Sequence, residues 1–104
     1  MGGERAENIE TLIAIIRERF GPCKIILFGS RARGDFLKES DYDIIVVSEK
    51  FRGIPFLRRM EDVYELWDGD ESIDIICYTP EEFDKKRKQI GIVSKAIEEG
   101  VVLV

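Results

Sequence analysis

The sequence predicts a small α+β domain in which a mixed β-sheet is flanked by helices, and three observations support this class. The chain has 104 residues, which is the size of one domain. Apolar residues at helical spacing alternate along it with short runs of β-branched residues. The predicted order is helix, strand, strand, helix, strand, two helices and a last short strand, which is typical of a mixed sheet with helical cover. We therefore interpret residues 1–104 as a single domain.

The first half of the chain predicts one helix and two strands. An amphipathic helix that ends at Gly21-Pro22 is indicated by five apolar residues at i, i+3, i+4 spacing: Ile9, Leu12, Ile13, Ile16 and Phe20. Residues 24–28 (KIILF) and 42–47 (YDIIVV) are apolar runs that predict buried strands. The segment between them, GSRARGDFLKES, is polar and rich in turn-forming residues.

The second half predicts three helices and two strands. Pro55 suits the first turn of a helix, whose apolar face is predicted to be Ile54, Leu57, Met60, Tyr64 and Trp67. Residues 72–78 (SIDIICY) predict a strand, and Thr79-Pro80-Glu81-Glu82 has the cap, proline and glutamate of a helix start. A last helix is expected up to Gly100, with its apolar positions at Ile92, Val93, Ala96 and Ile97, and residues 101–104 are expected to form a short strand.

The composition excludes several kinds of catalytic and binding site. The chain has no histidine, which excludes histidine-based acid–base and nucleophilic sites and leaves oxygen ligands for any metal. Its net charge of −5 argues against a dedicated nucleic-acid binder, so no direct nucleic-acid partner is expected. The basic stretches at Arg58-Arg59 and residues 85–88 are interpreted as solvated helix faces.

The sequence also indicates a compartment. Cys23 and Cys77 lie in apolar surroundings and are expected to be reduced, buried residues rather than a disulfide. No apolar run approaches the ~20 residues of a membrane span. The first ten residues lack the basic and apolar regions of a signal peptide. We therefore expect a cytoplasmic protein with no membrane partner.

Asp41 and Asp43 lie at the start of the second predicted strand. Residues two apart on a strand share a face, so the two carboxylates lie together, with Cα atoms about 6–7 Å apart. Ile45 and Val47 continue the same face inward. Paired carboxylates repel each other unless a cation neutralises them, which makes a magnesium site plausible. The alternative is a polar turn that begins the strand.

Gly29-Ser30 directly follows the first predicted strand. Glycine allows a ligand to approach the backbone closely, and exposed N–H groups with a serine hydroxyl suit an anion. Arg31 or Arg33 could add charge-assisted hydrogen bonds to phosphate. Together with the aspartates, this pattern predicts a site for a metal-bound nucleoside triphosphate, whereas each half alone is often only a turn.

Gly29-Ser30, ten intervening residues and Asp41-Tyr42-Asp43 resemble the G-S-x(10)-D-x-D signature of the DNA polymerase β-like nucleotidyltransferase superfamily. GSRARG followed by SDYD is similar to its minimal nucleotidyltransferase branch, and the resemblance covers essentially the whole chain. It implies the nucleotidyltransferase fold and a third carboxylate on a neighbouring strand. The matching residue is Asp74, an acid within the apolar run SIDIICY that would be costly to bury unpaired. Asp68, Asp70 and Glu71 are nearby substitutes in an apparent turn.

The resemblance also implies roles for these residues. Asp41, Asp43 and Asp74 would be the catalytic, metal-binding residues for two Mg²⁺ ions, with Mn²⁺ as a substitute. Gly29 and Ser30 would hold the phosphates of ATP or another NTP, helped by Arg31 and less by Arg33.

The resemblance further implies an activity, which is the transfer of AMP from ATP to a tyrosine hydroxyl of a partner HEPN-domain toxin, with the chain acting as antitoxin. Two alternatives stay open: a non-catalytic nucleotide-binding subunit that neutralises or regulates its partner by binding, and transfer to a small-molecule hydroxyl in a pocket that a partner subunit completes. The apolar residues Phe51, Ile54, Phe56 and Leu57 either form a contact surface, for example in a homo-oligomer, or pack over the sheet.

Overall fold

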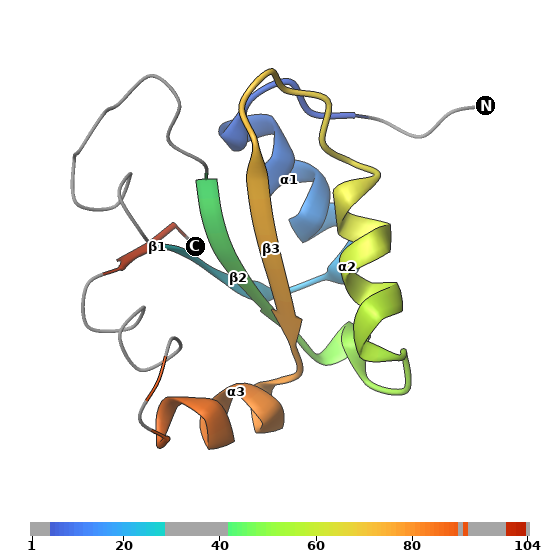
Figure 1. Cartoon of the computed structure of the whole chain (residues 1–104). Coiled ribbons are helices and arrows are strands. Elements are labelled where there is room, and N and C mark those ends of the chain that lie inside the picture. The colour runs from blue at the N-terminus through green and yellow to red at the C-terminus, as the bar shows by residue number, and fades with distance from the viewer. Residues whose placement is uncertain (1–4, 29–41, 90, 92–99, 104) are drawn as a thin grey trace.

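A four-stranded mixed sheet is the centre of the structure (Figure 1). The computed structural model describes residues 5–28, 42–89, 91 and 100–103. Its strands are β1 (Cys23–Phe28), β2 (Tyr42–Ser48), β3 (Ile73–Tyr78) and β4 (Val101–Val102), in the order β3-β2-β1-β4. β2 is parallel to β3 and antiparallel to β1, which also pairs antiparallel with β4. The predicted α+β class and the predicted strands are confirmed.

In the described part of the chain, three helices and a short 3₁₀ turn accompany the sheet: α1 (Ile9–Phe20), η1 (Glu49–Phe51), α2 (Phe56–Tyr64) and α3 (Pro80–Arg87). α1 begins at Asn8, whose side chain accepts a hydrogen bond from the Thr11 amide at 2.8 Å, and it ends at Gly21. α3 begins with the predicted capping box, in which Thr79 and Glu82 satisfy each other's backbone amides. The predicted helix before Gly100 lies outside the described residues.

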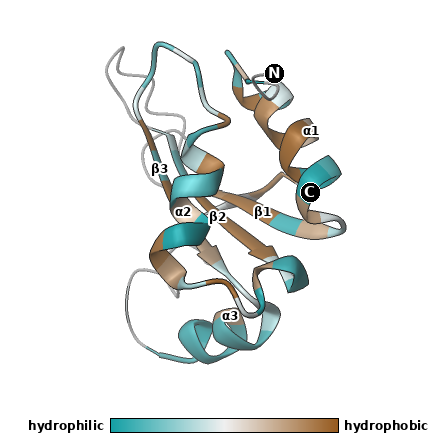
Figure 2. Ribbon diagram, turned by 90° about the vertical axis from the view of Figure 1, so that its right-hand side faces the viewer, coloured by the Kyte–Doolittle hydropathy of each residue, from teal (hydrophilic) through white to brown (hydrophobic). Residues whose placement is uncertain are grey.

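The two faces of the sheet bury separate apolar clusters. α1 and α2 lie over one face, where Ile44 and Val46 of β2 belong to the larger cluster. On the other face, Ile45 and Val47 of β2 pack with Phe83 of α3. Figure 2 shows the contrast between the hydrophobic strands β1 and β2 and the hydrophilic α3. Residues 85–88 are all exposed, which confirms the prediction of a solvated basic face.

The buried face of α2 differs from the predicted one. Arg59 and Val63 are the buried residues of the helix, whereas Leu57 is 69% exposed and Tyr64 is 39% exposed. Met60 and Trp67 pack against the larger cluster, as predicted. The prediction was wrong for Leu57 and Arg59, because it aligned apolar residues alone and placed Arg59 outside. Arg59 lies inward because its guanidinium binds the Glu82 carboxylate and because its Nε atom donates a hydrogen bond of 2.8 Å to the Ile54 carbonyl.

Side chains of α2 also occupy the outer edge of β3, which is a terminal strand of the sheet. The Tyr64 hydroxyl accepts a hydrogen bond from the Ile75 amide at 2.9 Å. The Arg59 Nη1 atom donates to the Cys77 carbonyl at 3.4 Å. Two backbone groups that face outward from this edge, the Ile75 amide and the Cys77 carbonyl, are therefore satisfied within the chain.

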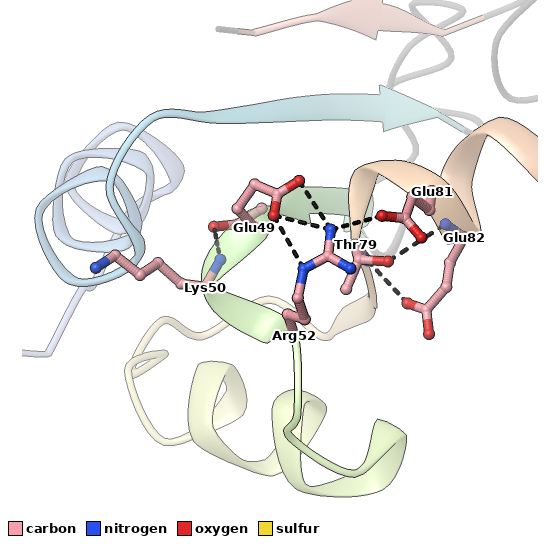
Figure 3. A network of polar contacts seen from close by, with 7 residues as sticks. Glu49, Lys50, Arg52, Thr79, Glu81 and Glu82 are labelled. Atoms are coloured by element: carbon pink, nitrogen blue, oxygen red, sulfur yellow. Dashed lines mark hydrogen bonds and ion pairs between the residues drawn. The ribbon is translucent and has the colours of Figure 1, made fainter.

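A polar network links η1 to α3 (Figure 3). Arg52 lies between two carboxylates, at 2.9 Å from Glu49 and 2.8 Å from Glu81. All three side chains are at least half exposed, so water screens each pair and its contribution to stability is small. The network fixes the position of the Glu49–Phe51 turn more than it stabilises the fold.

The cysteines are free in the structure, and Cys77 is buried as predicted, whereas Cys23 is only half-buried. Burial raises the pKa of the Cys77 thiol to about 12, so it is not a nucleophile at neutral pH. Within the residues that the structure describes, no helix has both the length and the apolar character needed to cross a membrane.

Ser48 ends β2 and is expected to be the most sensitive uncharged polar residue of the core. It is 1% exposed, and its hydroxyl donates to the Phe20 carbonyl at 2.7 Å and accepts from the Lys50 amide at 3.1 Å. Ser48→Ala should lower the free energy of unfolding by about 1–2 kcal/mol, because both backbone groups lose a partner. Urea unfolding measures this, with the exposed Ser72→Ala as control. Equal stability of the two variants would contradict the prediction.

Candidate active site

Asp43 and Asp74 lie side by side at one end of the sheet. Each is the second residue of its strand, and the two Cα atoms are partners in the parallel ladder between β2 and β3. Adjacent strands are about 4.8 Å apart and partner side chains share a face, so the carboxylates emerge as neighbours. Asp43 is half-buried and Asp74 is exposed.

The end of β1 completes this row of the sheet. Phe28, the last residue of β1, is the antiparallel partner of Asp43. Phe28, Asp43 and Asp74 therefore run across three strands in one line. Because β1 is antiparallel to β2, the last residue of β1 lies at the same end of the sheet as the first residues of β2 and β3. Gly29 is the next residue in the sequence after this row.

An apolar surface continues from the acids toward α3. Ile26, Ile45 and Ile76 are partners in the next row on the same face, and all three belong to or pack against the second apolar cluster. The prediction that Ile45 and Val47 continue the face of Asp43 is confirmed. The acids lie at the open end of that face, where a polar ligand can reach the exposed Asp74.

Asp74 lies in an apolar strand and would be costly to bury unpaired, but its side chain is exposed. The reason is its place on β3, a terminal strand whose first residues extend beyond the position of α3 on this face. Exposure removes the cost of desolvation, so Asp74 needs no buried partner. An exposed carboxylate remains free to exchange ligands with solvent.

The other predicted site residues lie outside the described residues. These are Gly29, Ser30, Arg31, Arg33 and Asp41. Of the acids considered as substitutes for Asp74, Asp68 and Asp70 are exposed in the turn before β3, as predicted, whereas Glu71 is half-buried. Asp74, not these turn residues, is the partner of Asp43 in the sheet.

The donor chemistry fits a hard divalent cation. Two carboxylates one strand apart present oxygen ligands of the kind that Mg²⁺ prefers, and Mg²⁺ completes its shell with water and phosphate. Among the described residues, no three acidic or other metal-binding side chains converge. Asp41, the predicted third ligand, is not one of those residues.

Sequence reasoning missed Phe28 as a neighbour of the acids. Its position at the end of the apolar run before Gly29-Ser30 was visible, but the register that aligns it with Asp43 was not. Antiparallel pairing of residues 24–28 with residues 42–47, if assumed from the sequence, would have indicated that Phe28 lies near Asp43.

Known proteins resemble this chain in sequence and in fold. Residues 9–103 match the family described as "Nucleotidyltransferase domain". A crystal structure titled as a "putative nucleotidyltransferase" from Sulfolobus solfataricus superimposes with a TM-score of 0.64 at 26% identity, over 89% of this chain and 73% of that one.

A relative in Methanocaldococcus jannaschii named "Putative protein adenylyltransferase" is 65% identical over 26 residues. That match covers 25% of this chain and about a quarter (26%) of the relative's length. The family match, in contrast, spans nearly the whole chain and includes both strands that carry the paired acids. The chain belongs to the nucleotidyltransferase domain family.

Proposed function

We propose that the chain is a magnesium-dependent enzyme that transfers AMP from ATP to a tyrosine hydroxyl of a HEPN-domain partner, and that it acts as the antitoxin to that partner. The observation that carries the proposal is the pairing of Asp43 with Asp74 beside the end of β1. It brings two oxygen ligands to the point where the Gly29-Ser30 motif begins in the sequence. The activity of the family supports the transferase class.

Each residue of the motif has a role in this proposal. Asp41, Asp43 and Asp74 would hold two Mg²⁺ ions, with Mn²⁺ as a substitute. Such ions supply charge neutralisation at the attacking and leaving oxygens of an in-line displacement. Gly29 and Ser30 would bind the β- and γ-phosphates through backbone amides and the serine hydroxyl, while Arg31 and Arg33 add positive charge.

The proposed transfer needs only ATP and the acceptor hydroxyl as reactants. The acceptor oxygen forms a bond to the α-phosphorus as the bond between that phosphorus and the bridging oxygen breaks. Pyrophosphate leaves with the electron pair of the broken bond. The hydroxyl proton passes through the Asp74 carboxylate to water, and exposure of this carboxylate makes that exchange direct.

Two observations support a protein acceptor. The relative in Methanocaldococcus jannaschii is named for adenylyl transfer to protein. The net charge of −5 disfavours a nucleic-acid acceptor because phosphate repels an acidic surface. The HEPN partner and the antitoxin role rest on the resemblance of GSRARG and SDYD to minimal nucleotidyltransferases.

The test is incubation of the chain with a HEPN-domain protein encoded beside it, ATP and Mg²⁺. Intact mass spectrometry should show the partner heavier by one or more AMP groups, and peptide mapping should place them on tyrosine. Omission of Mg²⁺ should abolish the increment, and the other three NTPs report base preference. A stable complex without any increment would contradict transfer and favour neutralisation of the partner by binding alone.

A further inference from the structure

A pocket of about 290 Å³ lies where the start of α2 meets the end of β3 and α3. Its lining residues are Phe56, Tyr78, Glu82 and Lys86. The rings of Phe56 and Tyr78 are 5.9 Å apart between centroids and inclined by 36°. Phe56 is 43% exposed, so an aromatic surface is open to a partner at this point.

The pocket is on the same strand and the same face as the proposed catalytic acid. Tyr78, Ile76 and Asp74 alternate along β3 with a period of two residues. Four residues of strand correspond to about 13 Å between Asp74 and Tyr78. Ile76, between them, is half-buried. An exposed acid, a half-buried isoleucine and the buried tyrosine that lines the pocket thus follow one another on one face of β3, and we call this row the track.

The charge at the pocket is positive although the chain is acidic. Glu82 is neutralised by Arg59, whose hydrogen bonds lower the pKa of the Glu82 carboxyl and keep it ionised. Lys86 is exposed, and none of the described residues forms an ion pair with it. One positive charge therefore stands beside the two rings, which suits a carboxylate next to an apolar group.

The edge of β3 limits how a partner can bind along the track. The Ile75 amide already donates to Tyr64, and the Cys77 carbonyl already accepts from Arg59. A partner strand cannot extend the sheet there without breaking both hydrogen bonds. Recognition is therefore expected through side chains, which makes the pocket the main anchor.

We propose that this pocket anchors the acceptor polypeptide: it takes an aromatic or large apolar side chain with a carboxylate beside it, about four residues away from the hydroxyl that is modified. The inference rests on the proposed function, because it names the recognition element for that same transfer. The spacing follows from the track, since an extended chain of four residues covers about 13 Å.

Fluorescence anisotropy with labelled peptides tests the anchor without relying on catalysis. The parent peptide carries one tyrosine and a Phe-Asp pair four residues away, in one set before the tyrosine and in another after it. Matched peptides replace Phe by Ala or Asp by Lys. We expect one parent to bind at least about fivefold more tightly than its Ala version, the effect of losing a buried aromatic anchor. Equal affinities for all peptides would overturn the inference.

Variants of the chain assign the effect to the pocket. Phe56→Ala should remove the preference for the Phe peptide, while Leu57→Ala, the next residue and 69% exposed, should retain it. Lys86→Glu should reverse the preference to the Lys peptide, while Lys85→Glu, on the same helix but outside the pocket lining, should not. Peptide preference unaffected by Lys86→Glu would contradict the assignment.

Failure of the anchor and failure of the transfer are distinguishable. Asp43→Asn should bind the parent peptide as the unmodified chain does but transfer no AMP to it. If the parent peptide binds with the expected preference and the chain with ATP and Mg²⁺ never labels it or the HEPN-domain protein, the anchor stands and the proposed transfer fails. If labelling occurs equally on all peptides, the transfer stands and the anchor fails.

Discussion

Asp43→Asn and Asp74→Asn are each expected to lower the rate of AMP transfer by about a thousandfold or more. A neutral amide keeps the shape of the side chain but removes the charge that would hold a cation beside the reacting phosphate. Such charge stabilisation amounts to several kcal/mol of the barrier, and each 1.36 kcal/mol is tenfold in rate. The initial rate of AMP incorporation into the partner, at saturating ATP and Mg²⁺, measures the loss.

The controls for these variants separate chemistry from folding. Asp68→Asn and Asp70→Asn remove exposed carboxylates from the turn before β3 and should leave the rate within about twofold. The thermal midpoint of Asp74→Asn should not fall, because Asp74 is exposed and removing one of two neighbouring negative charges relieves repulsion. Normal rates in either site variant would remove that residue from the catalytic site.

Glu82→Gln is expected to lower the free energy of unfolding by about 2–3 kcal/mol, the largest stability effect of a single exchange that we predict. Arg59 is 6% exposed, and it loses its only described carboxylate partner while its cation stays buried. The value lies below the 3–5 kcal/mol of fully buried pairs because the Glu82 side chain is 43% exposed. The thermal midpoint should fall by about 10 °C or more for a domain of this size.

Glu81→Gln is the matched control for this prediction. It removes the neighbouring glutamate, whose bridge to Arg52 is exposed on both sides and should contribute little to stability. The double variant with Arg59→Met and Glu82→Gln should recover only part of the loss. It leaves no unpaired buried charge, and Gln can keep the cap of α3, but the Ile54 and Cys77 carbonyls lose their donor. If Glu81→Gln and Glu82→Gln lowered the free energy of unfolding equally, the pair of Glu82 with the buried Arg59 would contribute no more than an exposed pair.

The same pair predicts a dependence on pH. The hydrogen bond from Arg59 holds the pKa of Glu82 below its usual value of 4.5. A lowered folded-state pKa means that the stabilisation is fully present above pH 4.5 and is lost as the pH falls through the lower, folded value. The difference in stability between the unmodified chain and Glu82→Gln should therefore shrink in acid. A constant difference between pH 7 and pH 3 would contradict this cause.

The local signals of the sequence predicted most elements because they depend on neighbouring residues. Thr79, Pro80 and Glu82 specify the start of α3 within one turn, and Gly21 ends α1 just after its last apolar position. The second strand was expected to carry its acids at the entrance and Ile45 inward, and both features follow from a period of two. These inferences needed no knowledge of which segments become neighbours.

The remaining features depend on long-range pairing. The parallel register of Asp43 with Asp74 and the antiparallel register of Phe28 with Asp43 join segments that are far apart in the chain. The position of Arg59 on α2 was assigned incorrectly because it pairs with Glu82, which lies 23 residues later in the chain and in another helix. No local sequence pattern indicates such a partner, so Arg59 was predicted to be exposed to solvent.

The cover over the edge of β3 has a consequence for behaviour in solution. An unpaired strand edge is a template for aggregation, since it offers free amides and carbonyls to another molecule. Here Tyr64 and Arg59 occupy such groups at Ile75 and Cys77, and β4 at the opposite edge has only two residues. Partial unfolding of α2 would uncover β3 while the rest of the sheet persists. Heat or acid that loosens α2 should therefore lead to fibrous or amorphous aggregates before the sheet itself melts.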